Sequence, residues 1–518
     1  MHKKHRNKKS RKSRSQSKVV EDALENQEKY EIKTSKVMGR YMVATTDINP
    51  GEVILSEEAI VVGPCVHCKL QCLGCYTELG GKVVRCTGCG WFLCSLTCPG
   101  SNKKHGHTKL ECSILKETKS SKYFDVKTAQ NHLAAIVPLR CLLLKTTDPS
   151  MYDFLMDMES HTEIRKSIPE IWNNNQINVV DRITKQWGLT EFTPEEIHVI
   201  CGILEVNCFE IGQQDVNIRG LYPKAFLMSH DCIPNTNHCD SDDYRLTVRA
   251  SVSIGEGSPI TLSYAYTLQN TPKRREHLLD NKFFECNCSR CQDPAELGAY
   301  SSALYCPKCS KGLVLANNPL DFETSYSCTS KTSGKCAGYT ITNNSMKLLI
   351  NRVSDEVDNI NSNDVKAMEF FINKYRNVLH PYHYIFLGVK ISLSQVYGKI
   401  QGYLINELTE DQLQRKIDIC NELLSIFDII EPGYTRIRGV TLYELHAPLM
   451  ILLTKKFEKN LVSKQELKVK LREVVKCLLE ASTILGNEPI ASSEGMMGLA
   501  AQQALLQIKD WEKIVGRI

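Results

Sequence analysis

Cysteine clustering constrains this chain more than any other feature of its sequence. Of its 23 cysteines, nine lie at residues 65–112 and seven at residues 286–336. A disulfide-rich secreted domain is small and follows a signal peptide, whereas this chain has 518 residues and a basic N-terminus with no apolar stretch after it. Clustered cysteine pairs in such a chain are typical of zinc sites, because thiolates favour tetrahedral zinc. The sequence therefore predicts a soluble intracellular protein with structural zinc.

The first cysteine window has the spacing of two interleaved zinc sites. The cross-braced assignment gives four ligands to each ion: Cys72, Cys75, Cys94 and Cys98 for one, and Cys86, Cys89, His107 and Cys112 for the other. His105 is a rival for the His107 position, Cys65 and Cys68 are left unassigned, and buried or reactive thiols are the alternative to zinc. Because so small a module has little core, metal binding would supply most of its folding free energy, on the order of 10 kcal/mol per site.

The second window contains a three-ligand set and a separate four-cysteine set. Cys286, Cys288 and Cys291 stand in a Cys-Asn-Cys-Ser-Arg-Cys segment, so a fourth zinc ligand must come from elsewhere in the chain. The cysteines farther along suit a zinc ribbon, although their last gap is wide: Cys306, Cys309, Cys328 and Cys336. The window therefore predicts a third zinc site and a candidate fourth.

The remaining sequence reads as a multidomain globular chain, with 42% apolar and 24% charged residues. Alternation of apolar and polar residues predicts short strands at residues 30–64. Residues 113–198 read as mainly helical, and strand-like runs return at residues 201–266, in particular at 245–250 and 259–264.

From about residue 343 onward, apolar residues recur at helical spacing. Ser463 with Glu466 is a candidate capping box, and Pro432-Gly433 is expected to end the helix that carries Cys420. Several helices in a row favour an array of tetratricopeptide-like hairpins, although no crisp repeat proves it.

The net charge of +5 comes from the N-terminal tail. Residues 1–18 hold nine of the 64 Lys and Arg residues and no acid, so the rest of the chain has 55 basic against 59 acidic residues. Such a tail reads as a solvated arm, a nuclear-import signal or a nucleic-acid-binding arm. No apolar run approaches the ~20 residues that span a bilayer, so no membrane association is expected.

In their order along the chain, these elements resemble the SMYD family, in which a catalytic SET domain is split by a MYND zinc finger. The first cysteine window resembles that finger ligand by ligand, and the four-cysteine set resembles the arthropod branch of the family. The other motifs that carry the resemblance are Gly39-Arg40-Tyr41 with Ile48-Asn49-Pro50-Gly51-Glu52, Asn207-Cys208-Phe209-Glu210, Ser229-His230-Asp231-Cys232-Ile233-Pro234-Asn235, the strand that ends at Tyr264, and Phe284-Glu285-Cys286-Asn287-Cys288-Ser289-Arg290-Cys291.

The resemblance implies an α+β multidomain fold, in which a split SET β-fold with an inserted MYND finger precedes an all-α TPR-like domain. It also implies that Cys232 is the missing ligand of the post-SET zinc site. The expected domains are a disordered basic tail at 1–28, the SET N-terminal part at 29–71, the MYND-type finger at 72–112, a helical SET insertion at 113–200, the SET C-terminal part at 201–270, the post-SET and additional zinc-binding segment at 271–342, and the helical TPR-like domain at 343–518.

The same resemblance implies methyl transfer from S-adenosylmethionine to lysine side chains of histone or other proteins. Tyr264 would be the catalytic residue that orients the acceptor amine. The residues implied for the cofactor pocket are Gly39, Arg40, Tyr41, Asn207, Ser229, His230, Tyr264 and Phe284. Zinc would be structural, in three sites and the candidate fourth, because closed Cys and His shells leave no open position for water.

Besides Asp231, which adds a negative charge that the family's usual serine lacks, three positions depart from the family's pattern. Ser229 stands where the family has an asparagine that contacts the cofactor, a loss of one or two hydrogen bonds at ~0.5–1.5 kcal/mol each. Tyr41 replaces a small glycine. Lys282 stands where an aromatic residue often walls the lysine channel, and a cation there would repel an incoming lysine unless it is turned outward. These departures favour the alternative of a catalytically weakened adaptor that acts in transcriptional repression.

The resemblance also implies partners. They are protein substrates, proline-rich peptides bound by the MYND finger, and chromatin or co-repressor complexes, with non-specific nucleic-acid contact by the basic tail. A monomer in both nucleus and cytoplasm is expected. A dedicated nucleic-acid-binding zinc protein is disfavoured, because the cysteine spacing does not place a recognition helix as a two-Cys, two-His finger does.

Overall fold

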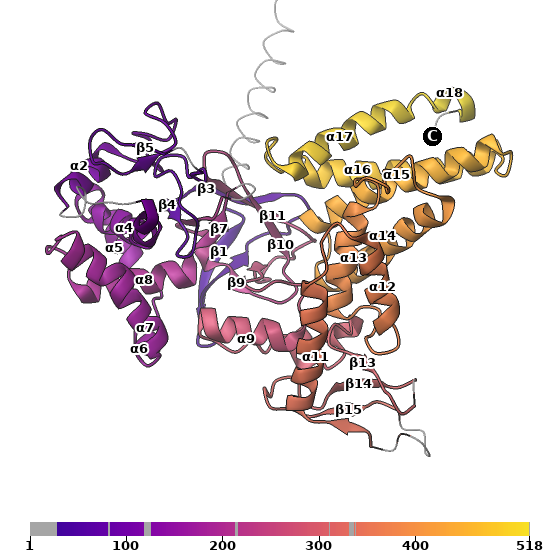
Figure 1. Cartoon of the computed structure of the whole chain (residues 1–518), viewed down its shortest axis with the longest axis horizontal. Coiled ribbons are helices and arrows are strands. Elements are labelled where there is room, and N and C mark those ends of the chain that lie inside the picture. The colour runs from indigo at the N-terminus through magenta and orange to yellow at the C-terminus, as the bar shows by residue number, and fades with distance from the viewer. Residues whose placement is uncertain are drawn as a thin grey trace, which may run out of the picture.

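The computed structural model describes residues 28–80, 83–118, 126–212, 216–309, 311–330, 336 and 338–516. Apart from residue 28, the tail expected at residues 1–28 lies outside these described residues. Strands and zinc-site loops precede a long helical array, so the α+β multidomain fold expected from the sequence is confirmed. Figure 1 shows the helical array, in orange and yellow, beside the strands.

Small sheets of two or three strands build the β part. The strands are β1 (Tyr30–Ser35), β2 (Gly39–Ala44), β3 (Val53–Glu58), β4 (Val61–Pro64), β7 (Phe209–Ile211), β8 (Ile218–Leu221), β9 (Ser229–His230), β10 (Thr236–Asp240), β11 (Arg245–Ala250) and β12 (Thr261–Leu262). β3 pairs with β11 and β4 pairs with β8, both antiparallel, whereas β9 and β12 are parallel. Strands before the first cysteine window therefore pair with strands after it, and one β domain is split by the insertion.

The insertion consists of the loops of the first cysteine window, which we call the zinc-site loops, and a helical segment. Its elements are β5 (Val84–Arg85), β6 (Phe92–Leu93), α2 (Lys109–Glu117), α3 (Val126–Ala129), η1 (Gln130–Ala135), α4 (Ile136–Thr147), α5 (Pro149–Met156), α6 (Thr162–Lys166), α7 (Pro169–Asn175), η2 (Gln176–Val180), η3 (Arg182–Gln186) and α8 (Pro194–Asn207). The loops and the helices share one buried core that includes Trp91, Leu142 and Trp187. The finger is therefore packed onto the helices and is not an isolated module.

Helix α8 corrects one expectation, because strand-like structure was expected from residue 201 and the helix runs on to Asn207. Thr193 and Glu196 form a capping box at its start, and Pro194 occupies its first turn, which favours a helical N-terminus. Its apolar residues are fully buried: Ile197, Ile200, Ile203 and Leu204. Tertiary packing therefore overrides the strand preference of its β-branched residues.

A cysteine-rich segment follows the β part. Its elements are α9 (Thr271–Lys282), α10 (Ser289–Gln292), η5 (Glu296–Gly298), β13 (Leu304–Tyr305), β14 (Leu313–Ala316), β15 (Tyr326–Cys328) and β16 (Thr340–Ile341), with η4 (Ala225–Leu227) earlier in the chain. β13 to β16 form an antiparallel meander in sequence order, which we call the ribbon. Buried Glu296 pairs with both Arg274 of α9 and Arg290 of α10, which fixes these helices to each other.

The C-terminal part is entirely helical in the residues described. It comprises α11 (Asn343–Asp358), α12 (Val365–Tyr375), α13 (Tyr384–Val396), α14 (Glu410–Ile430), α15 (Arg436–Glu458), α16 (Lys464–Leu485), α17 (Ser493–Ile508) and α18 (Glu512–Val515). The Ser463–Glu466 capping box is present at the start of α16, and α14 ends two residues before Pro432, so both predictions are confirmed. Within the described residues, no helix is both long enough and apolar enough to cross a membrane.

One glycine places the helical array against the β part. Gly433 has a φ of +82°, and a Cβ at this position would lie 1.9 Å from the carbonyl oxygen of Ser251. The next residue, Tyr434, donates its backbone N–H to the same oxygen at 2.8 Å. Only glycine combines this φ with this close approach, so the junction is fixed by backbone contact.

Candidate active site and zinc centres

Four groups of side chains in the described residues have the geometry of zinc sites. In each group the ligand atoms all lie within 4.8 Å of one another: Cys72, Cys75, Cys94 and Cys98; Cys86, Cys89, His107 and Cys112; Cys232, Cys286, Cys288 and Cys291; Cys306, Cys309, Cys328 and Cys336. Sulfur–sulfur distances of 3.5–3.7 Å recur in these groups. They are close to the ~3.8 Å edge of a tetrahedron with zinc–sulfur bonds of ~2.3 Å. The donor sets therefore fit zinc without large rearrangement.

His107, and not its rival His105, joins the second of these groups. Its Nε2 faces the Cys89 sulfur at 3.3 Å, and its Nδ1 lies 2.7 Å from a carboxylate oxygen of Glu111, which is 1% exposed. Arg140 binds the other oxygen of that carboxylate at 2.5 Å. A carboxylate behind a ligating histidine fixes the ring's orientation and makes it a stronger ligand.

We expect Glu111→Gln to weaken zinc binding at this site by about 10- to 100-fold, because the amide cannot hold the imidazole as a carboxylate does. Zinc release from the full-length protein to a chromogenic chelator measures the effect. Glu117→Gln, at the exposed end of the same helix, is the matched control. Equal release from Glu111→Gln and wild type would show that Glu111 does not support the ligand.

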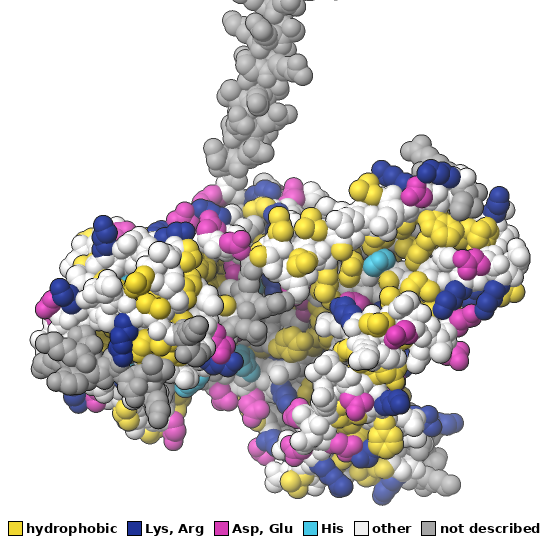
Figure 2. All heavy atoms as spheres, turned by 45° about the horizontal axis from the view of Figure 1, so that its top comes forward, with side chains coloured by type: hydrophobic (Ala, Val, Ile, Leu, Met, Phe, Trp, Pro, Cys, Tyr) yellow, Lys and Arg dark blue, Asp and Glu magenta, His cyan; other side chains and the backbone are white. Residues whose placement is uncertain are grey.

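A cleft of about 740 Å³ lies where the end of α8, β7, β12 and the end of α9 meet. Its lining includes Asn207, Phe209, Phe226, Tyr264 and Lys282. Figure 2 shows the surface hollowed between the half that carries the zinc finger and the half that carries the helical array. At this volume the cleft is large enough for a small-molecule ligand or cofactor.

Tyr264 is fixed at the wall of this cleft from two sides. Its hydroxyl donates to the carbonyl oxygen of Met228 at 2.6 Å, and its backbone N–H donates to Nδ1 of His230 at 3.0 Å. Its ring centroid lies 5.3 Å from that of His230 and 6.3 Å from that of Phe284. Burial raises the pKa of Tyr264 to about 12. The hydroxyl therefore remains protonated at ordinary pH, with its oxygen free to accept a further hydrogen bond.

Ser229 and His230 form β9 beside β12, which brings them next to Tyr264. Among buried side-chain atoms of the described residues, the Ser229 hydroxyl is one of those without a hydrogen-bond partner. A buried hydroxyl without a partner costs free energy, of order 1–3 kcal/mol, unless a bound group satisfies it. Ser229, His230 and Phe284 adjoin Tyr264 but are not themselves among the residues that line the cleft.

Asn207 and Arg40 connect the cleft to the helical insertion. Asn207 donates its side-chain amide to the carbonyl oxygens of Glu159 and Ile203 at 2.9 and 2.8 Å. Arg40 binds Asp157 at 2.8 Å, and its guanidinium lies 5.8 Å from the ring centroid of Phe226. Gly39 and Tyr41 flank Arg40 on the β1–β2 hairpin, so this hairpin reaches the cleft wall through the Arg40 side chain.

Lys282 points into the cleft, which settles an orientation that the sequence left open. Its ammonium donates to the carbonyl oxygens of Val206 at 2.6 Å and Glu205 at 3.4 Å, and lies 5.6 Å from the Tyr264 ring centroid. Burial lowers the pKa of Lys282. The Lys282 nitrogen therefore lies beside Tyr264 and is not turned outward to solvent.

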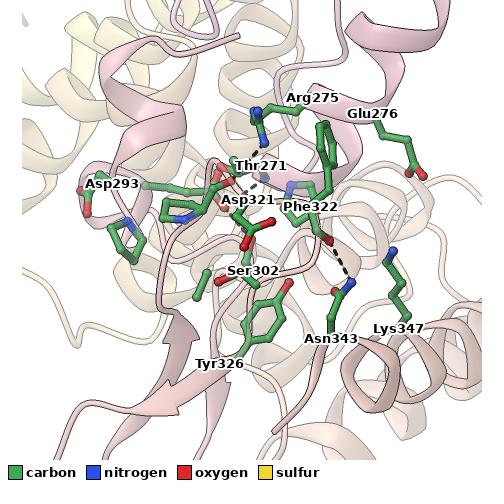
Figure 3. A pocket seen from close by; sticks show the side chains of 16 residues that line it. Thr271, Arg275, Glu276, Asp293, Ser302, Asp321, Phe322, Tyr326, Asn343 and Lys347 are labelled. Atoms are coloured by element: carbon green, nitrogen blue, oxygen red, sulfur yellow. Dashed lines mark hydrogen bonds between the residues drawn. The ribbon is translucent and has the colours of Figure 1, made fainter. Parts of the chain in front are cut away.

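The ribbon and α11 hold α9, the helix that ends at Lys282. Figure 3 shows their junction, where the guanidinium of Arg275 lies 4.4 Å from the ring centroid of Phe322 and Asn343 donates to the Phe322 carbonyl at 2.8 Å. The cavity there is about 80 Å³, far below the ~300 Å³ of the smallest usual ligand pockets. This junction therefore supports α9 and is too small for a cofactor.

Sequence reasoning missed several residues that shape the cleft. Phe226 lines it, and Asp157 and Glu159 hold Arg40 and Asn207 from the helical insertion. The Arg40–Asp157 contact joins residues 117 positions apart. No spacing or composition signal marks such a pair, because the contact depends on how the insertion folds back.

Comparisons with known proteins identify relatives of this chain. The SET domain family model matches residues 39–265. The SET domain-containing protein SmydA-8, isoform B, of Drosophila melanogaster is 26% identical over 421 residues, which cover 78% of this chain and 88% of that protein. The histone-lysine N-methyltransferase Smyd1 of Mus musculus is 27% identical over 312 residues, which cover 55% of this chain and 60% of the relative. A solved SET domain of LSMT with lysine and AdoHcy aligns over 94% of this chain and 92% of its own, at 12% identity and a TM-score of 0.25.

Proposed function

Because the chain is a SET-domain protein of the SMYD family, we propose that it is a protein-lysine N-methyltransferase that uses S-adenosylmethionine. The carrying observation is that Tyr264 lines the cleft and donates its hydroxyl to the carbonyl oxygen of Met228, the neighbour in the chain of Ser229 with its buried and unpartnered hydroxyl. Histones or other proteins that present a lysine are the proposed substrates.

In this proposal the residues around the cleft divide the work. Asn207, Ser229, His230 and Phe284 would hold the cofactor, which supplies a methyl group on a sulfonium. The Tyr264 hydroxyl donates a hydrogen bond to the carbonyl oxygen of Met228. Its oxygen would accept an N–H from the substrate amine and so direct the amine's lone pair. Orientation of this kind is a large part of catalysis in a displacement reaction.

The zinc ions would act through structure. Each closed Cys or Cys–His shell leaves no position for water or substrate. The first two sites would shape the finger, for which we propose the capture of proline-rich peptides. The third would join β9–β10 to the segment that carries Phe284, and the fourth would stabilise the ribbon behind α9.

The adaptor alternative is favoured by one observation, the inward-pointing Lys282. Its ammonium occupies space beside Tyr264 that a substrate lysine needs, and two like charges in a cleft of low dielectric repel each other strongly. A protein of this kind would keep its zinc sites and peptide partners but turn over slowly. On the face seen in Figure 2, basic and acidic side chains intermingle, so this face offers no continuous basic surface for a nucleic acid.

Calorimetric titration of zinc-loaded, full-length protein with S-adenosylmethionine tests the proposal. We expect micromolar binding, weakened by roughly two- to tenfold in Ser229→Ala through the loss of one hydrogen bond. Ser251→Ala is the matched control, because Ser251 is another buried serine without a partner for its hydroxyl and lies against the helical array. The absence of binding to a folded protein would reject the enzyme and favour the adaptor.

A further inference from the structure

Lys282 differs from every other lysine of the described chain in facing the proposed catalytic tyrosine from within the cleft. It is the last residue of α9, and Phe283 after it has a φ of +60°. This left-handed turn ends the helix with Lys282 on one side of it and Phe284 on the other, both beside Tyr264. The amine and the ring proposed to hold the cofactor therefore both lie against Tyr264, the residue proposed to orient an acceptor amine.

The Lys282 nitrogen is held by hydrogen bonds and by no carboxylate of the described residues. Its two acceptors are backbone carbonyls at the C-terminal end of α8, and within the described residues its nitrogen forms no ion pair. A neutral amine has two N–H donors and one lone pair. If Val206 and Glu205 accept the two N–H groups, the lone pair is left free to face the cleft. Burial, which lowers the pKa of Lys282, increases the share of this neutral form.

We propose that Lys282 is a methyl acceptor of the cleft that it lines, so that the protein methylates itself at this residue; the inference rests on the proposed function. The Lys282 ammonium first loses a proton to solvent. Its lone pair then forms a C–N bond to the methyl carbon of S-adenosylmethionine, while the C–S bond breaks and leaves its electron pair on sulfur. The Lys282 nitrogen gains the positive charge that the sulfonium loses, and S-adenosylhomocysteine leaves.

Chemical footprinting tests whether Lys282 shares the cleft with the cofactor, independently of turnover. Full-length, zinc-loaded protein is acetylated with a water-soluble reagent, with and without S-adenosylhomocysteine. When the concentration of S-adenosylhomocysteine is about ten times its dissociation constant, about a tenth of the sites remain free. Acetylation of Lys282 should then fall about tenfold. Lys273 on the same helix is exposed, with its ammonium 5.0 Å from the Tyr384 ring centroid, and should be labelled equally in both samples.

Mass spectrometry then locates the methyl group. The protein is incubated with S-adenosylmethionine that carries a deuterated methyl group, and cleavage after glutamate releases the peptide of residues 277–285. We expect the label on Lys282, none on this peptide in Lys282→Arg, and none in Tyr264→Phe. Tyr264→Phe produced with ¹⁵N throughout, so that its peptide is told apart by mass, should stay free of the deuterated methyl group when mixed with unlabelled wild-type protein, because the acceptor lies in its own cleft.

The outcomes separate the two proposals. Cofactor binding with an unprotected Lys282, or protection without methyl label on it, overturns self-methylation and leaves the enzyme standing. Label on Lys282 of Tyr264→Phe in the mixture shows transfer between molecules and overturns it as well. Failure to bind S-adenosylmethionine in the calorimeter overturns the proposed function and self-methylation with it.

Discussion

Replacing Tyr264 by phenylalanine is expected to lower methyl transfer by about 10²- to 10³-fold, the usual cost of removing one polar group aimed at the reacting atoms. The change deletes only the hydroxyl that binds Met228 and keeps the ring that packs against His230 and Phe284. Zinc content and the melting temperature should therefore stay near those of the wild type. Release of S-adenosylhomocysteine with histone proteins as acceptors measures the transfer.

Tyr266→Phe is the matched control for this experiment. Tyr266 lies two residues farther along the chain and is 59% exposed, so its hydroxyl should contribute little. Because the pKa of Tyr264 is raised to about 12, its own ionisation should not shape the rate between pH 6 and 9. If Tyr264→Phe retained full activity, Tyr264 would be an ordinary residue at a strand end with a satisfied hydroxyl.

Local patterns in the sequence predicted local structure well. The spacing of the cysteines indicated which sulfurs the structure brings together, since ligands two or three residues apart share one turn. The Ser463 capping box and the end of α14 were predicted for the same reason. Helix α8 was misjudged at its C-terminal half, because a run of buried apolar residues reads alike in a strand and in a buried helix.

Some contacts between distant segments could be predicted only from the family resemblance. Others could not be predicted from the sequence at all. Spacing left the three-cysteine segment short of a ligand, and the resemblance supplied Cys232, whose sulfur lies 3.5 Å from that of Cys291. Neither route predicted that Arg40 would bind Asp157. The orientation of Lys282 was also open, because it depends on the turn at Phe283 and on carbonyls of α8 that lie more than 70 residues earlier.

Replacing Cys232 is also expected to have a large effect, on zinc content and on cofactor binding. The Cys232 sulfur lies 3.9 Å from that of Cys286 and 3.5 Å from that of Cys291, and His230 lies two residues before it with Nε2 3.4 Å from the same sulfur. Zinc at this group would join β9, which holds Ser229, to the segment that holds Phe284. One structural zinc is worth on the order of 10 kcal/mol of folding free energy, as much as the stability of a whole domain.

We therefore expect Cys232→Ser to lose one zinc per molecule and all measurable binding of S-adenosylmethionine, because both walls of the cofactor site come apart. Elemental analysis measures the metal, and calorimetry measures the binding. Cys239→Ser is the matched control: Cys239 lies on β10 nearby, outside the four groups, and its sulfur donates only to the carbonyl oxygen of Asn487. Unchanged zinc content in Cys232→Ser would show that the three cysteines take their fourth ligand elsewhere. Loss of zinc with binding preserved would show that other contacts hold β9 and Phe284 together, among them the tilted rings of His230 and Phe284 and the hydrogen bond from Arg290 to the Cys232 carbonyl.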